Sequence, residues 1–177
     1  GGIFESYAII NKAGSTIYYD LKEEVVTNTN DFQGTNLGTY NNTGTLLLKG
    51  AENKTNKCSP TDITNGTLYY RVYPENGTPG SFQTMNLPFA ENNISGPGCE
   101  NQKWAQTNAN INLVNGLCNG TYTLEVYTAA NYQGAGTGTF VANNNGANYK
   151  ANFTINNEAG SGIYESYVLL DTGNGTT

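Results

Sequence analysis

The chain has 177 residues, of which only 12% are charged, and its formal net charge at pH 7 is −6. It contains three cysteines, no histidine and a single arginine, Arg71. An acidic chain lacks the basic surface that nucleic acids require, and without histidine neither histidine-dependent catalysis nor a histidine-ligated zinc site is possible. No apolar stretch approaches the roughly 18 residues of a membrane helix. We therefore expect neither a nucleic-acid partner nor membrane insertion.

Short apolar or alternating segments, separated by turn residues, run through the whole chain. Asn, Thr, Gly and Ser supply 80 of the 177 residues, and no segment sustains a helical period. Strands are expected over residues 3–10, 16–21, 45–49, 67–73, 82–87, 103–106, 111–114, 122–128 and 148–155. About eight to ten short strands indicate an all-β fold, an antiparallel β-sandwich of the immunoglobulin/fibronectin-like kind with long loops.

Four local features refine this expectation. Residues 11–14 (Asn-Lys-Ala-Gly) supply a turn that joins the first two strands in a hairpin, whereas residues 22–43 are polar and are expected to form a long excursion. Gly50 is expected to end the strand at 45–49. Tyr122 stands near the start of a strand, where the tyrosine corner of immunoglobulin-like domains bonds its hydroxyl back to the preceding chain.

A ten-residue segment near the start of the chain recurs near its end. Residues 2–11 read GIFESYAIIN and residues 162–171 read GIYESYVLLD, with five positions identical and the others closely related. Either two strands share a local pattern, or residues 1–155 form one module, 156–162 a linker and 163–177 the start of the next module. Because Gly1-Gly2 is not a translation start, we expect a mature or excised piece of a longer protein.

The recurring segment, residues 162–171, is called the C-terminal repeat segment below. It is either the first strand of a following module or a strand donated to a neighbouring copy, and both interpretations predict end-to-end assembly with copies of this chain. The residues expected to form this assembly strand are Ile163, Tyr164, Tyr167, Val168, Leu169 and Leu170.

Several segments resemble modules of large secreted surface proteins of Flavobacterium-type Bacteroidota. The resemblance is carried by residues 53–58, 62–73, 87–89, 99–104, 120–127 and 146–151. It implies export by the type IX route, an extracellular or cell-surface location, and a role as a repeated structural or adhesin module. The class offers no catalytic residues to carry over, so we expect no enzyme activity.

The three cysteines suit an exported protein with one disulfide and one remaining thiol. Cys58 and Cys99 both fall in segments that the resemblance covers and that we expect to be loops, which favours a Cys58–Cys99 bridge. Cys118 departs from the family pattern, so a Cys99–Cys118 bridge stays open as the alternative.

Two kinds of ligand site remain as hypotheses. Asp20, Glu23, Glu24 and Asp31 cluster in the sequence and suggest calcium, although no D-x-D-x-D-G loop is present and a solvated acidic loop is the plainer interpretation. No other cofactor is expected.

Carbohydrate recognition is the alternative to a purely structural role. Trp104, Tyr132 and Tyr149 lie near Asn and Gln side chains in the sequence, and flat aromatic faces beside amides suit surface glycans as partners. A single tryptophan in a sandwich, however, commonly belongs to the core.

Overall fold

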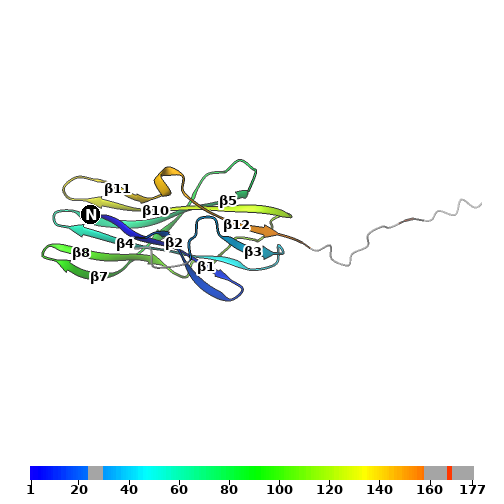
Figure 1. Ribbon diagram of the computed structural model, residues 1–177, viewed down its shortest axis with the longest axis horizontal. Helices are drawn as coiled ribbons and strands as arrows, with labels where there is room; N and C mark the ends of the chain where they lie inside the picture. Colours follow the sequence, from blue (N-terminus) through cyan, green and yellow to red (C-terminus); the bar gives the residue numbers. More distant parts are fainter. Residues whose placement is uncertain (24–29, 158–166, 169–177) are drawn as a thin grey trace, which may run out of the picture.

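The computed structural model describes residues 1–23, 30–157 and 167–168. Within these residues the chain forms two stacked β-sheets, a sandwich of twelve strands with one short 3-10 turn at Asn144–Gly146 (Figure 1). Its strand pairs are antiparallel except that β3 (Asn36–Tyr40) runs parallel to β12 (Tyr149–Ile155). None of the described residues forms a helix long and apolar enough to cross a membrane.

The first sheet contains the N-terminal strand as an inner member. Its order is β2 (Ser15–Lys22), β1 (Gly2–Lys12), β4 (Leu46–Cys58), β8 (Cys99–Gln106) and β7 (Phe89–Gly96), with β9 (Ile111–Asn112) also pairing with β4. The β1–β2 hairpin confirms the predicted turn: Ala13 and Gly14 both have positive φ, as a two-residue type I′ turn requires.

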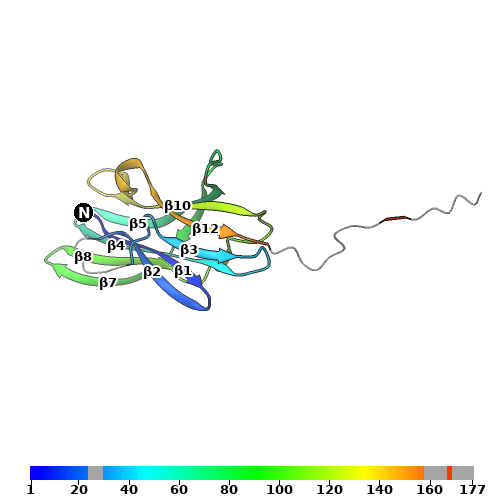
Figure 2. The same cartoon turned by 45° about the vertical axis from the view of Figure 1, so that its right-hand side comes forward.

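The second sheet is built around a long central strand. Its order is β3, β12, β10 (Gly120–Gln133), β5 (Asp62–Pro74) and β6 (Gln83–Leu87), with β11 (Gly138–Ala142) also pairing with β10. Figure 2 separates this layer, marked by β10 and β12, from the layer that contains β7 and β8.

The apolar core lies between the two sheets. Its largest fully buried side chains include Leu48 from the first sheet and Leu124 and Phe153 from the second. The expected corner bond of Tyr122 is present, because its hydroxyl donates to the carbonyl oxygen of Cys118 at 2.9 Å.

Some elements differ from the expectation. The excursion at 22–43 contains β3, and the weakly apolar strands β7 and β11 were not expected. β4 does not end at Gly50 but continues to Cys58. Cys58 and Cys99 therefore lie on paired strands rather than in loops.

Gly50 lies at a bulge inside β4 and not at the end of the strand. The register of β1 against β4 shifts beside it, and Gly50 has a φ of 150°. A Cβ at Gly50 would overlap the carbonyl oxygen of Gln106, at the end of β8. The glycine thus marks a bulge and a close backbone approach inside a strand, not the end of one.

This close approach leads to a stability prediction. Gly50→Ala should lower the free energy of unfolding by about 3 kcal/mol or more, because the backbone of β8 must move and φ is strained. Gly80→Ala is the matched control, since a Cβ there meets no atom within 4 Å. Urea unfolding of both variants checks it, and equal effects of the two substitutions would contradict this account of Gly50.

Candidate functional site

Strand β1 is held in place by side-chain contacts on both faces. Ser6 is fully buried, and its hydroxyl donates to Asn53 Oδ1 at 2.8 Å and lies 2.7 Å from Thr128 Oγ1. Asn53 lies on β4 of the same sheet, whereas Thr128 lies on β10 of the opposite sheet. Ser6 therefore connects the two sheets across the dry interior.

The outer face of β1 carries a charged contact. Glu5 Oε2 accepts the Lys54 ammonium at 2.5 Å and the Tyr7 hydroxyl at 2.8 Å. Burial raises the pKa of Glu5, but the bonds from Lys54 and Tyr7 outweigh it and leave that pKa below its ordinary value. Glu5 and Lys54 are direct cross-strand partners, so this pair fixes the register of β1 on β4.

A bulge sets the spacing of the buried residues in β1. The register against β4 shifts between Ile3 and Glu5, so Ile3 and Ser6 both point inward although they are three positions apart. Ala8, Ile9 and Ile10 are also fully buried. A simple alternating strand would not give this pattern.

The C-terminal repeat segment falls largely outside the described residues. Of the predicted assembly strand, Ile163, Tyr164, Leu169 and Leu170 lie outside them. Tyr167 and Val168 are described and are 78% and 82% exposed. Their counterparts in β1 are Tyr7, which is half-buried, and Ala8, which is fully buried.

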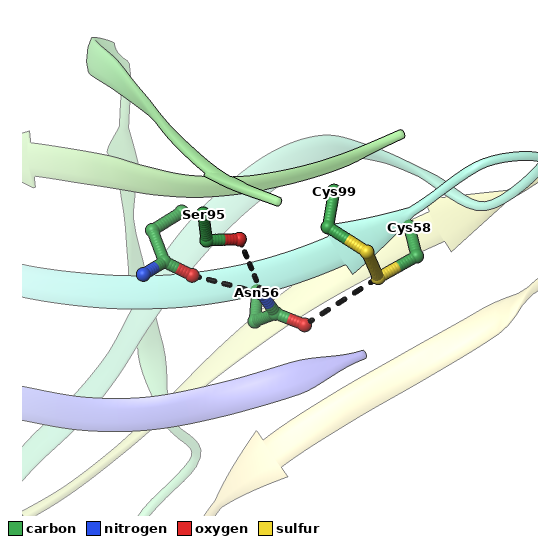
Figure 3. Close-up of a disulfide and its surroundings, with 5 residues drawn as sticks. Asn56, Cys58, Ser95 and Cys99 are labelled. Carbon is green, nitrogen blue, oxygen red and sulfur yellow. Dashed lines mark hydrogen bonds between the residues drawn. A yellow bond between two sulfur atoms is a disulfide. The ribbon is translucent and has the colours of Figure 1, made fainter. Parts of the chain in front are cut away.

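The favoured disulfide is confirmed. Cys58 and Cys99 are paired residues of β4 and β8 and form the bridge (Figure 3). Cys118 is exposed and free. Beside it, Asn56 Nδ2 donates to Asn101 Oδ1 at 2.8 Å and to Ser95 Oγ at 3.3 Å. The intervening chain includes β5 and β6 of the opposite sheet, and a bridge of this kind typically contributes about 2–4 kcal/mol.

An open hollow of about 450 Å³ lies beside the disulfide. Its charged lining residues are Lys57, Asp62 and Glu100, and the Lys57 ammonium contacts Asp62 Oδ1 at 2.5 Å and Glu100 Oε2 at 3.0 Å. The bond from Asp62 chiefly raises the pKa of Lys57, so this amine stays protonated. A protonated, doubly paired lysine is not a nucleophile, so Lys57 serves here as a charge partner of the two carboxylates.

The structure does not bring the three predicted sugar-binding aromatics together on one surface. Trp104, on β8, and Tyr149, on β12, are buried in the core. Tyr132, on β10, is half-buried and stacks on Phe140 with ring centroids 4.4 Å apart. Glycan binding by a platform of these residues stays a prediction without geometric support.

Three of the four acidic residues suggested for calcium do lie together. One carboxylate oxygen each from Asp20, Glu23 and Asp31 lies within 4.8 Å of the others, and Glu24 is outside the described residues. Asp20 is buried, Glu23 is half-buried and Asp31 is exposed.

A fourth constellation, which was not predicted from the sequence, lies on the outer face of the second sheet. Glu125 on β10 accepts Arg71 Nε at 3.0 Å and a terminal guanidinium nitrogen of Arg71 at 2.9 Å. It also accepts the Tyr73 hydroxyl at 2.7 Å and Asn148 Nδ2 at 2.8 Å. Arg71 further stacks over Phe82, with its guanidinium carbon 4.0 Å from the ring centroid. The only arginine of the chain, in the middle of a strong strand, was the signal that could have revealed it.

This network is a structural clamp. The Glu125 side chain is only 4% exposed, and two loops complete the network, one through Asn148, which bonds Glu125, and one through Phe82, which stacks on Arg71. Burial raises the pKa of Glu125, but the bonds from Arg71, Asn148 and Tyr73 prevail and hold that pKa below its ordinary value of 4.5. A fully satisfied buried carboxylate of this kind has no capacity left for acid–base work.

Comparisons of the chain with protein-family models, with curated proteins and with solved structures found no match.

The clamp leads to a pH-dependent stability prediction. Glu125→Gln should lower the free energy of unfolding by about 3 kcal/mol at pH 7, because it leaves the Arg71 charge unpaired. Since the folded pKa of Glu125 is lowered, its contribution is complete above the unfolded pKa of roughly 4.3 and is lost as pH falls through the folded value. The deficit of the variant should therefore shrink at low pH.

Urea unfolding of the wild type and the variant between pH 2.5 and 7, values chosen as roughly spanning carboxyl titration, measures this deficit. Glu91→Gln is the control, because the Glu91–Lys103 pair lies on the exposed surface and should contribute less than about 1 kcal/mol. A Glu125→Gln deficit as small as that of the control, or one that grows toward low pH, would refute the clamp.

Proposed function

We propose that this chain is a non-enzymatic structural or adhesive module of an extracellular fibre or tandem-repeat surface protein, joined end to end to copies of itself. The observation that carries the proposal is the match between the contacts of β1 and the residues kept in the C-terminal repeat segment. The charged, polar and tyrosine positions that are identical in both copies are those that make specific contacts in β1.

The identical positions include Glu5, Ser6 and Tyr7, which recur at 165–167. Glu5 pairs with Lys54, Ser6 bonds Asn53 and Thr128, and Tyr7 bonds Glu5. Two strands that shared only a general strand pattern would not need the same three polar side chains at these positions. Their recurrence supports a segment that fits the same kind of slot.

The positions that differ support the same proposal. Ala8, Ile9 and Ile10 are fully buried, and the repeat segment has Val168, Leu169 and Leu170 in their places. The inward spacing of Ile3 and Ser6, set by the bulge in β1, recurs as Ile163 and Ser166. An exposed segment would not need these apolar residues, and burying each one favours assembly by about 1.5–3 kcal/mol.

The place of β1 favours the tandem variant over a strand donated between separate chains. β1 lies between β2 and β4, so a sandwich of this kind requires a strand in that position. In this structure the chain's own residues 2–12 fill the slot. On the proposal, residues 163–177 supply the equivalent strand of a following module, and 156–162 link the two.

The setting of the proposal is outside the cytoplasm, at the cell surface or beyond it. A disulfide between paired strands suits an oxidising compartment. The resemblance to type IX-secreted surface modules points the same way. An immunoglobulin/fibronectin-like form of the sandwich is part of the proposal, and the tyrosine corner between Tyr122 and Cys118 supports it.

Removal of the repeat segment tests this proposal. A chain that ends at Asn157 should unfold cooperatively within about 2 °C of the full chain, because the segment belongs to another module. In the full chain the segment has no second module to complete, so on the proposal its apolar side chains remain available to other copies, and sedimentation should show weaker self-association for the truncated chain. The full-length double variant Leu169→Asp, Leu170→Asp is the control, because it removes only the apolar surface of the segment. Its self-association should be as weak as that of the truncated chain. If the truncated chain loses its cooperative transition, the segment is part of this sandwich and the proposal fails.

A further inference from the structure

The acidic cluster lies where the edges of the two sheets meet. Asp20 is on β2, at one edge of the first sheet, and Asp31 precedes β3, at one edge of the second. Glu23 follows directly after β2. Asp20 and Glu23 therefore lie where the chain leaves the first sheet, and Asp31 lies where the chain enters the second.

Backbone bonds hold this crossing in place. The Asp20 N–H donates to the Asn30 carbonyl at 2.8 Å, and the Phe32 N–H donates to the Asp20 carbonyl at 3.0 Å. Asp31 lies between these two bonds, and Phe32 is fully buried in the core. Because both flanking residues are fixed, Asp31 cannot move away from Asp20 without breaking strand-like pairing.

The electrostatics of the cluster are unfavourable without a cation. Asp20 is only 5% exposed, and neither its buried Oδ2 nor the buried Glu23 Oε2 has a hydrogen-bond partner within the described residues. No ion pair in the described part of the chain reaches Asp20, Glu23 or Asp31.

We propose that Asp20, Glu23 and Asp31 bind a calcium ion. Calcium takes carboxylate and carbonyl oxygens at about 2.3–2.6 Å, so two oxygens on opposite sides of one ion lie roughly 4.8 Å apart. The three carboxylate oxygens already lie within 4.8 Å of one another. Magnesium demands near-ideal octahedral geometry and keeps several of its waters, so carboxylates fixed by the backbone suit calcium better.

The unpartnered Asp20 oxygen is what separates this cluster from a solvated acidic loop. A solvated loop exposes its carboxylates to water, whereas Asp20 is withdrawn from water and aimed at two other acids. Buried charges in proteins are paired or coordinate metals. A bound ion would neutralise the cluster and tie the edge of one sheet to the edge of the other.

Titration of the chelator-treated full chain with calcium chloride tests the proposal. Calorimetry should show one ion per chain with a Kd of about 10⁻⁵–10⁻³ M, and calcium should raise the Tm more than magnesium at equal ionic strength. Asp31→Asn should weaken binding by about tenfold or more. Asp62→Asn, at an aspartate outside the cluster that pairs with Lys57, should leave the calcium affinity unchanged.

A second variant separates loss of binding from loss of folding. Asp20→Asn should raise the Tm in chelator, because it relieves repulsion, and should abolish the response to calcium. If it fails to fold, the exposed Asp31→Asn alone decides. Absence of both heat and Tm change in the wild type at about 10 mM calcium would overturn the proposal, as would unchanged affinity in Asp31→Asn.

Discussion

The hydroxyl of Ser6 joins the two sheets from an inner strand, and the rest of the sandwich depends on that strand being in register. Its two partners, Asn53 and Thr128, come from β4 and β10, so a slip of β1 by one residue would bury an unsatisfied polar group and turn its apolar residues outward. Glu5 and Lys54 fix the same register from the outer face. The first twelve residues are therefore a central part of the fold.

Few charges are present, and most of the basic side chains that form ion pairs serve to fix strands. Lys54 fixes β1, Lys57 lies beside the disulfide, and Arg71 clamps Glu125 under two loops. Low charge limits repulsion between packed modules, which suits an array. The acidic cluster around Asp20 is the exception, since no ion pair among the described residues reaches its carboxylates, and a divalent ion supplies the missing charge on our proposal.

Much of the fold follows from local sequence, because strands with strong patterns and turn residues need little tertiary information. The hairpin at Ala13-Gly14 and the corner of Tyr122 belong to this group. The disulfide was favoured through the family resemblance instead, with its cysteines expected in loops rather than on the paired strands where they lie. The prediction that a strand ends at Gly50 was wrong, because glycine can either end a strand or permit a close approach of two backbones inside one. Only the position of Gln106 in the folded chain distinguishes these two roles.

The sites depend on contacts that the sequence does not display. The clamp on Glu125 brings together residues from two strands and two loops, and the withdrawal of Asp20 from water results from the return of the chain at Phe32. Trp104 is a predicted site residue that the fold withdraws from the surface, because this candidate sugar-binding side chain is buried in the core.

The central claim is that the C-terminal repeat segment can occupy the slot of β1. A two-module chain tests it most directly, in which residues 1–171 continue into residues 12–157, so that 162–171 must serve as the first strand of the second module. Calorimetry should show about twice the unfolding enthalpy of the single module, at a similar Tm. The same chain with residues 162–171 scrambled should show the enthalpy of one module only. If the unscrambled chain also gives the enthalpy of a single module, the repeat segment is not equivalent to β1 and the account is wrong.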